Sequence, residues 1–159
     1  MTTAPVILRP AKREEIPAIV AMLIDDPLGG GREVLSDPLP QIYYDAFDDM
    51  KDDPNNRLLA AEQDGQIVGT LQITFIRSLS RKGARRAQIE AVRVASTHRG
   101  KGLGHEIFVA AIARARAEGC SLVQLTTDKS RPDAHRFYES LGFVASHEGM
   151  KLTLDPPKS

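Results

Sequence analysis

Apolar side chains recur every three or four residues in some segments and every second residue in others, so the chain is predicted to alternate between helices and strands. In chain order, the predicted elements are a strand at 6–10, helices at 13–24 and 38–50, strands at 57–62, 66–76 and 88–95, a helix from 103 to Gly119, a strand at 122–125, a helix at 132–141, and strands at 143–144 and 150–154.

This order of elements predicts a mixed α/β fold with helices on both sides of one sheet. Asp64-Gly65 suits a tight hairpin turn between the second and third strands, and residues 77–86 read as a basic connector. The glycine run at 29–31 reads either as a phosphate nest or as a loop, and we favour the loop. Because no repeat or linker interrupts the pattern, we expect a single domain over 1–159.

Composition narrows the functional classes. The chain has 159 residues, 42% of them hydrophobic and 26% charged, which is ordinary for a globular protein. Its 21 basic and 21 acidic side chains give a net charge of zero, which argues against nucleic acid as the main partner. With one cysteine, no intrachain disulfide can form. No segment approaches the ~20 apolar residues of a membrane span and the start lacks signal-peptide features, so we expect a cytoplasmic protein.

The most informative stretch is a glycine-rich turn between a strand and a helix. Gly100, Gly102 and Gly104 lack a Cβ and allow a close backbone approach, and the helix that follows presents its first unpaired N–H groups. Arg99 and Lys101 add positive charge to this turn. The pattern predicts a binding site for a phosphate or pyrophosphate.

Neither the P-loop pattern nor the dinucleotide-binding pattern fits this turn. Residues 99–104, Arg-Gly-Lys-Gly-Leu-Gly, resemble instead the Gln/Arg-x-x-Gly-x-Gly/Ala signature of the GNAT superfamily of N-acetyltransferases. Residues 89–94 resemble that family's fourth strand, and residues 134–143 its last helix and the following turn. Together the three motifs extend the resemblance over residues 67–154.

The resemblance implies a mostly antiparallel sheet whose fourth and fifth strands are parallel and splayed, with the thioester of acetyl-CoA in the gap. It implies acetyl-CoA as cosubstrate and no metal. The pantetheine arm would pair with the fourth strand, where a backbone amide would face the thioester carbonyl. The residues expected to bind the cofactor are Val92, Arg93, Val94, Arg99, Gly100, Lys101, Gly102, Leu103, Gly104, Arg131 and Tyr138.

Acetyl transfer to an amine needs a group that removes a proton from the amine and one that protonates the leaving thiolate. Glu90, nine residues before Arg99, is the expected general base. The alternative is that Glu90 is only a solvated residue of the strand. We favour the base, because an acid within the apolar stretch 87–94 would be costly to bury without a role. Tyr138 is the expected general acid. The alternative is that Tyr138 is only a packed aromatic side chain. Arg131 stands where many relatives carry Asn, which puts one pantetheine contact in doubt, although Arg131 could reach a phosphate.

The other reactive side chains give weaker signals. Cys120 lies between the end of a helix and a strand, so we expect a small buried residue and not an acyl-accepting nucleophile. The four histidines show no metal-ligand spacing with carboxylates or cysteines. The expected reaction is therefore direct attack in a ternary complex.

The sequence says least about the molecule that accepts the acetyl group. Residues 25–53 are strongly acidic and residues 77–101 strongly basic, which would steer a cationic amine and the anionic cofactor to opposite sides. The acids could equally form the solvated face of the second helix. We expect an amine-bearing small molecule or peptide end as acceptor, allow for a homodimer, and expect neither nucleic acid nor membrane as partner.

Two other classes remain for comparison. A non-catalytic module that binds acyl-CoA as a sensor would keep the glycine turn without needing Glu90 or Tyr138. A nucleic-acid binder would need aromatic side chains for base stacking, and none occurs between Arg77 and Lys101. The presence of both Glu90 and Tyr138 favours the enzyme.

Overall fold

The structure is a computed structural model that describes residues 4–25 and 31–155. Its contacts divide the chain into two compact units, Met1–Leu125 and Thr126–Ser159. Each unit is described by itself below. Most of the glycine-run loop expected after the first helix lies outside the described residues.

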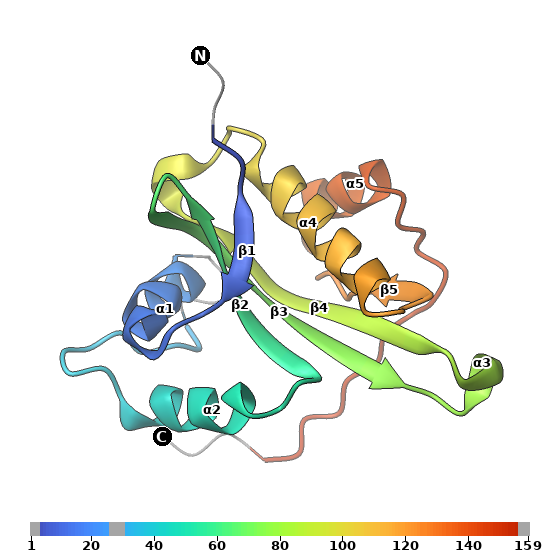
Figure 1. Cartoon of the computed structure of the whole chain (residues 1–159), viewed down its shortest axis with the longest axis horizontal. Coiled ribbons are helices and arrows are strands. Elements are labelled where there is room, and N and C mark those ends of the chain that lie inside the picture. Colours follow the sequence, from blue (N-terminus) through green and yellow to red (C-terminus); the bar gives the residue numbers. More distant parts are fainter. Residues whose placement is uncertain (1–3, 26–30, 156–159) are drawn as a thin grey trace. The chain divides into compact units, whose positions relative to one another are not determined.

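The first unit contains one five-stranded sheet with the order β1-β2-β3-β4-β5 (Figure 1). Neighbouring strands are antiparallel except for β4 and β5, which are parallel, as predicted. The strands are β1 (Ile7–Pro10), β2 (Asn56–Gln63), β3 (Gln66–Arg77), β4 (Arg85–Val94) and β5 (Leu122–Gln124). The helices are η1 (Arg13–Glu15), α1 (Ile16–Ile24), α2 (Gln41–Lys51), α3 (Ser80–Gly83), η2 (Ser96–His98) and α4 (Leu103–Ala117).

The two connections on either side of β3 can be compared with the sequence predictions. Asp64 and Gly65 have φ values of 53° and 75°, so the predicted tight hairpin between β2 and β3 is confirmed. The predicted basic connector is shorter than expected, because β3 extends to Arg77 and β4 already begins at Arg85. The long β3–β4 hairpin therefore ends at α3 (Figure 1).

Helices cover both faces of the sheet, as predicted. On one face, Ile16, Ile19 and Val20 of α1 join a buried cluster with Ala60 of β2. On the other face, Ile107 of α4 lies against Gly69 of β3. Alternation along β2 separates the two cores, because successive side chains of a strand point to opposite faces.

Gly69 lies where α4 packs tightly against β3 and β4. A Cβ built on Gly69 would lie 2.7 Å from the backbone oxygen of Arg93 and 2.7 Å from Cδ1 of Ile107. Only a residue without a side chain lets β3, β4 and α4 meet at this distance. This contact helps to set how close α4, and the glycine turn before it, lies to the sheet.

The far end of α4 is held by a charged cluster. The two carboxylate oxygens of Glu118 lie 2.9 Å from Arg57 Nη2 and 3.3 Å from Arg85 Nη1, and both guanidinium groups lie over the ring of Phe75. Partial burial raises the pKa of Glu118, but the hydrogen bonds and charges of Arg57 and Arg85 outweigh it, so the pKa is lowered. Glu118 therefore stays ionised between the two arginines.

The second unit contains α5 (Pro132–Ser140), which begins at the proline and stops before Gly142, as predicted. The predicted strands at 143–144 and 150–154 are wrong: the structure assigns neither segment to a strand. The side chains of Val144, Met150, Leu152 and Leu154 are 80–94% exposed. Without an apolar surface to cover, the alternating pattern of this segment gives it no reason to form a strand.

None of the helices within residues 4–25 and 31–155 combines the length and the apolar character that crossing a membrane requires.

Replacing Gly69 by Ala should destabilise the protein by about 1–3 kcal/mol, because the added methyl group must displace a backbone carbonyl and a packed Ile side chain. Urea unfolding of wild type and variant measures the difference. Gly31→Ala is the matched control, since a Cβ there meets nothing within 4 Å. Equal unfolding midpoints for all three proteins would show that the close approach at Gly69 is not a constraint.

Candidate functional site

The glycine turn before α4 has the geometry of an anion site. Gly100 and Gly102 adopt left-handed φ values of 78° and 77°, and Gly102 is the N-cap of α4. A Cβ at either glycine would meet nothing within 4 Å, so the conformation, and not crowding by the protein, requires glycine here. No side chain caps this end of α4, so its first N–H groups remain available to an anionic ligand.

Arg99 lies beside this turn but already has a partner. Its Nη2 donates a 2.8 Å hydrogen bond to the backbone oxygen of Asp25 and lies 3.2 Å from the Asp25 carboxylate. Asp25 is the residue that ends α1. Both side chains are half exposed, so a pyrophosphate would compete with Asp25 for Arg99.

A β-bulge interrupts β4, the strand that leads to the turn. Gln72 of β3 pairs with Glu90, whereas Thr70 pairs with Arg93, so β4 holds one extra residue at this point. Ala91 adopts a left-handed φ of 53°, which is uncommon for a residue with a Cβ. The bulge re-aims the segment that follows it, which contains the residues predicted to pair with pantetheine.

The parallel pairing of β4 with β5 ends just before the bulge. The registered pairs run from Arg86↔Leu122 to Gln88↔Gln124, and β4 continues to Val94 without a further partner from β5. Within the first unit, this leaves one edge of β4 open along Val92 and Val94. A side-chain nitrogen of Arg93 donates to the backbone oxygen of Val92 at 2.9 Å.

Glu90 lies immediately before the bulge and is exposed. The expectation that Glu90 is buried within the apolar stretch is therefore wrong, because β4 directs its carboxylate to solvent. Its Oε1 accepts a 2.9 Å hydrogen bond from Nε2 of Gln88, and Gln88 Oε1 in turn accepts from Nε2 of Gln124 at 2.9 Å. Sequence reasoning missed both glutamines, although Gln88 lies two residues before Glu90 and hence on the same face of a strand.

Tyr138 and Arg131 belong to the second unit. Tyr138 is half-buried, and its ring makes edge contacts with Phe137 and Phe143 at centroid distances of 5.6 and 6.0 Å. Arg131 is the N-cap of α5, and its backbone N–H donates to the Asp128 oxygen at 3.0 Å. Hydrogen bonds from Ser130 lower the pKa of Asp128 in the same turn.

Cys120 does not have the properties of a nucleophile. It is partly buried, and this burial raises the pKa of its thiol, so the thiolate is disfavoured. This agrees with the prediction of a small packed residue. Among residues 4–25 and 31–155, no three His, Cys, Asp or Glu side chains are grouped in a way that could hold a metal ion.

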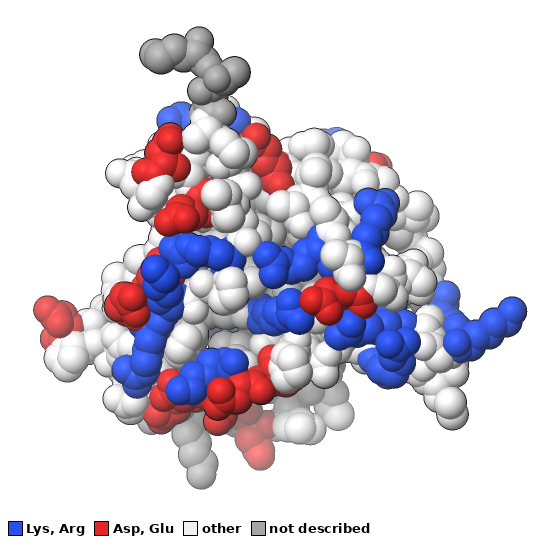
Figure 2. Space-filling model, viewed as in Figure 1, with Lys and Arg blue, Asp and Glu red and all other residues white. Residues whose placement is uncertain are grey.

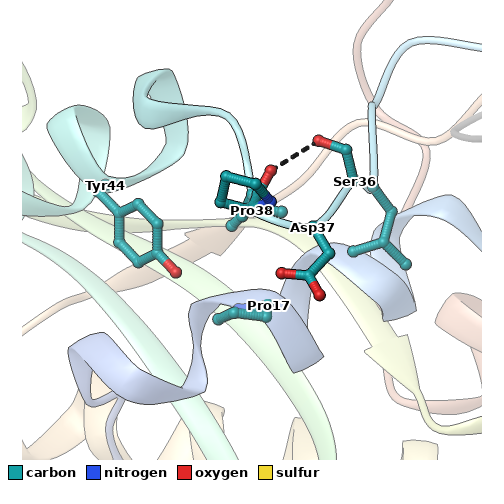
Figure 3. Close-up of a pocket in the computed structure, with 7 residues that line it drawn as sticks. Pro17, Ser36, Asp37, Pro38 and Tyr44 are labelled. Carbon is teal, nitrogen blue, oxygen red and sulfur yellow. Dashed lines mark hydrogen bonds between the residues drawn. The ribbon is translucent and has the colours of Figure 1, made fainter.

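A hollow of about 530 Å³ lies between α1 and the segment before α2 (Figure 3). The Asp37 carboxylate points into it, and Ser36 Oγ donates to the Pro38 oxygen at 2.9 Å. Pro17, another lining residue, lies in the first turn of α1, whereas Asp25 beside Arg99 is the C-cap of that helix. The hollow and the Arg99 side chain therefore adjoin opposite ends of α1. The lining residues are Pro17, Leu35, Ser36, Asp37, Pro38, Leu39 and Tyr44.

The predicted separation of charge is only partly related to this site. Figure 2 shows acidic side chains along the edge that α2 occupies in Figure 1, and basic side chains around the α3 end of the hairpin. Arg77 and Arg86 belong to that end, which is about 30 Å along β4 from the glycine turn. That the charged segments steer the amine and the cofactor to opposite sides stays a prediction.

Comparison with known proteins identifies relatives of this chain. Residues 20–143 match the acetyltransferase (GNAT) family. The chain is 29% identical over 141 residues to an aminoalkylphosphonate N-acetyltransferase from Salmonella typhimurium, covering 88% of this chain and 86% of that protein.

Solved structures of similar proteins share this fold. A transcriptional regulator from Bacillus halodurans is 50% identical with a TM-score of 0.89, covering 94% of this chain and 99% of that one. An acetyltransferase from Trypanosoma brucei is 25% identical with a TM-score of 0.73, again covering 94% of this chain and 99% of that one. The family match spans most of the sequence and includes both β4 and the glycine turn. The chain belongs to the acetyltransferase (GNAT) family.

Proposed function

We propose that the protein is an acetyl-CoA-dependent N-acetyltransferase that moves an acetyl group to a primary amine by direct attack in a ternary complex. The observation that carries the proposal is the geometry of β4. Its pairing with β5 ends at Gln88, a bulge follows at Ala91, and the open edge leads to the glycine turn. A ligand with an extended arm that leads to a pyrophosphate matches this arrangement of strand edge and glycine turn.

Each residue of the site has one task in the proposed reaction. The N–H groups from Gly100 to Gly104, with Lys101 and Arg99, hold the pyrophosphate, and Leu103 starts the helix that aims them. The backbone of Val92, Arg93 and Val94 pairs with the pantetheine arm, and an N–H there stabilises the oxyanion. Arg131 supplies a further positive charge for a phosphate.

Proton transfer is assigned to two side chains. Glu90 takes the proton from the attacking amine, whose nitrogen forms the new bond to the acetyl carbon. The carbon–sulfur bond then breaks, and the Tyr138 hydroxyl protonates the departing thiolate. The exposure of Glu90 removes the argument from burial, and it leaves the carboxylate within reach of an acceptor.

The proposed acceptor is an amine-bearing small molecule or peptide end. The name of the Salmonella relative denotes an amine-bearing acceptor, which supports the amine but not the identity of the rest of the molecule. The acidic face of α2 would favour a cationic acceptor. However, Asp48 on that helix lies 3.3 Å from Arg13 Nε and 4.0 Å from Lys51 Nζ, as expected for a solvated helix face.

A non-catalytic acyl-CoA sensor is the second candidate, because the Bacillus halodurans structure that is 50% identical is described as a transcriptional regulator. Consumption of acetyl-CoA in the presence of a panel of amines separates the two. The enzyme requires amine-dependent release of free thiol, whereas a sensor binds acetyl-CoA without turnover. A single domain over 1–159 and a cytoplasmic location remain part of the proposal.

Gly102→Ala should weaken acetyl-CoA binding by about 1–3 kcal/mol, because an L side chain disfavours the left-handed φ that aims the amides at the pyrophosphate. Calorimetric titration with acetyl-CoA measures the change. Gly119→Ala is the matched control: Gly119 follows the other end of α4 and has a φ of 78° and equally open surroundings. Similar affinities in the two variants would contradict the assignment of the turn.

Glu90→Gln should lower kcat by about 10²- to 10⁴-fold while leaving acetyl-CoA affinity nearly unchanged, since only the base is removed. Tyr138→Phe should slow thiolate expulsion within the same range. Steady-state kinetics with a responsive amine, paired with calorimetric titration, measures both effects. Glu14→Gln, at an exposed carboxylate of η1, controls for the loss of a charge. Wild-type kcat in both site variants would leave positioning alone as the mechanism.

A further inference from the structure

Three polar side chains form a continuous hydrogen-bonded row across the parallel strands. Gln124 of β5 donates through Nε2 to Oε1 of Gln88, and Gln88 donates through Nε2 to Oε1 of Glu90, both at 2.9 Å. Gln88 and Gln124 are half-buried, whereas Glu90 is exposed. The row thus leads from the interior of the β4–β5 pair to the proposed base.

The strand register explains why these side chains meet. Gln88 and Glu90 are two residues apart on β4, so they share one face of the sheet. Gln124 is the register partner of Gln88 in the last of the three registered β4–β5 pairs. The row is therefore built at the point where β5 leaves β4, immediately before the bulge at Ala91.

The row has a direction, because a carboxamide has one donor end and one acceptor end. Gln124 donates to the carbonyl oxygen of Gln88, which leaves the NH₂ end of Gln88 facing Glu90. A carboxylate only accepts hydrogen bonds, so this is the orientation that Glu90 requires. Reversing the Gln88 amide would place its carbonyl oxygen against the carboxylate.

Glu90 has a second glutamine neighbour that does not join the row. Gln72 is its register partner on β3, but the Gln72 Nε2 donates instead to Oδ1 of Asn56 at 2.8 Å. Proximity to Glu90 is therefore shared by two glutamines, whereas the hydrogen bond is made by Gln88. This difference supplies a matched control on the neighbouring strand.

We propose that Gln88 is a positioning residue for Glu90, and that Gln124 positions Gln88 by fixing the direction of its amide. The inference rests on the proposed role of Glu90 as general base. An exposed glutamate samples several rotamers, and the bond from Gln88 restricts it to one. With Oε1 held in this way, Oε2 is left to accept the proton of the amine.

The test compares kcat in glutamine variants made in two backgrounds. Gln88→Met keeps the length of the side chain but removes the donor, and should lower kcat by about 10- to 100-fold with the KM for acetyl-CoA unchanged. Gln124→Met should lower kcat by a smaller factor. Gln124→Glu should lower it at least as far as Gln124→Met, because a carboxylate at 124 would attract the NH₂ end of Gln88 away from Glu90. Gln72→Met should leave kcat unchanged.

Repeating Gln88→Met in the Glu90→Gln background separates positioning from a general structural effect. If Gln88 acts through Glu90, the second substitution should change kcat by less than about 2-fold there, since the carboxylate it positions is already absent. An equal loss in both backgrounds, or wild-type kcat in Gln88→Met, would overturn the positioning role. A reduced kcat in Glu90→Gln together with a wild-type kcat in Gln88→Met would overturn the positioning role of Gln88 and leave the proposed function intact.

A spectroscopic measurement keeps the inference testable without turnover. The side-chain NH₂ resonances of Gln88 should shift in Glu90→Gln and in Gln124→Met, and stay in place in Gln72→Met. Unchanged Gln88 resonances in the first two variants would overturn the row whether or not the protein acetylates any amine. Absence of turnover of every amine by the wild type, with these shifts present, would count against the proposed function and leave the hydrogen-bonded row established.

Discussion

The close approach at Gly69 is the constraint on which the rest of the site depends. Because β3 has no side chain at this position, Ile107 of α4 packs directly against its backbone and the carbonyl of Arg93 lies next to it. The helix is thereby fixed against the strands that carry the open edge. The amides at the start of α4 belong to the same helix, so this packing also bears on where the proposed anion site lies relative to the strand edge.

The departure of β5 from β4 gives the site its second element. A fully paired parallel sheet would satisfy the backbone of β4 on both sides and leave no room for an extended ligand. Here the pairing stops after Gln88, and the bulge at Ala91 turns the following segment. The glutamine row lies at this junction, so one irregularity of the sheet accounts for both the open edge and the position of Glu90.

Much of the fold could be predicted from sequence, because hydrophobic period and turn glycines are local signals. The hairpin at Asp64-Gly65 and the glycine turn agree with expectation. The parallel β4–β5 pair agrees with what the family resemblance implied. The left-handed Ala91 could not be predicted, because the register of two neighbouring strands imposes it. The same holds for the contact between Gln88 and Gln124. The prediction of two terminal strands was wrong, since the alternating pattern at Met150 and Leu152 does not reveal whether a surface exists to bury these side chains.

The open edge of β4 also bears on aggregation. An unpaired strand edge is a template on which another chain can add a strand, and proteins restrict such edges by shortening, twisting or interrupting them. Within the first unit, the free stretch of β4 begins beside a bulge, where the ladder is broken and the local twist increases. The irregularity that leaves this edge open thus also makes it a poor template for self-association, so the proposed ligand site and the protection against strand addition have a common structural origin.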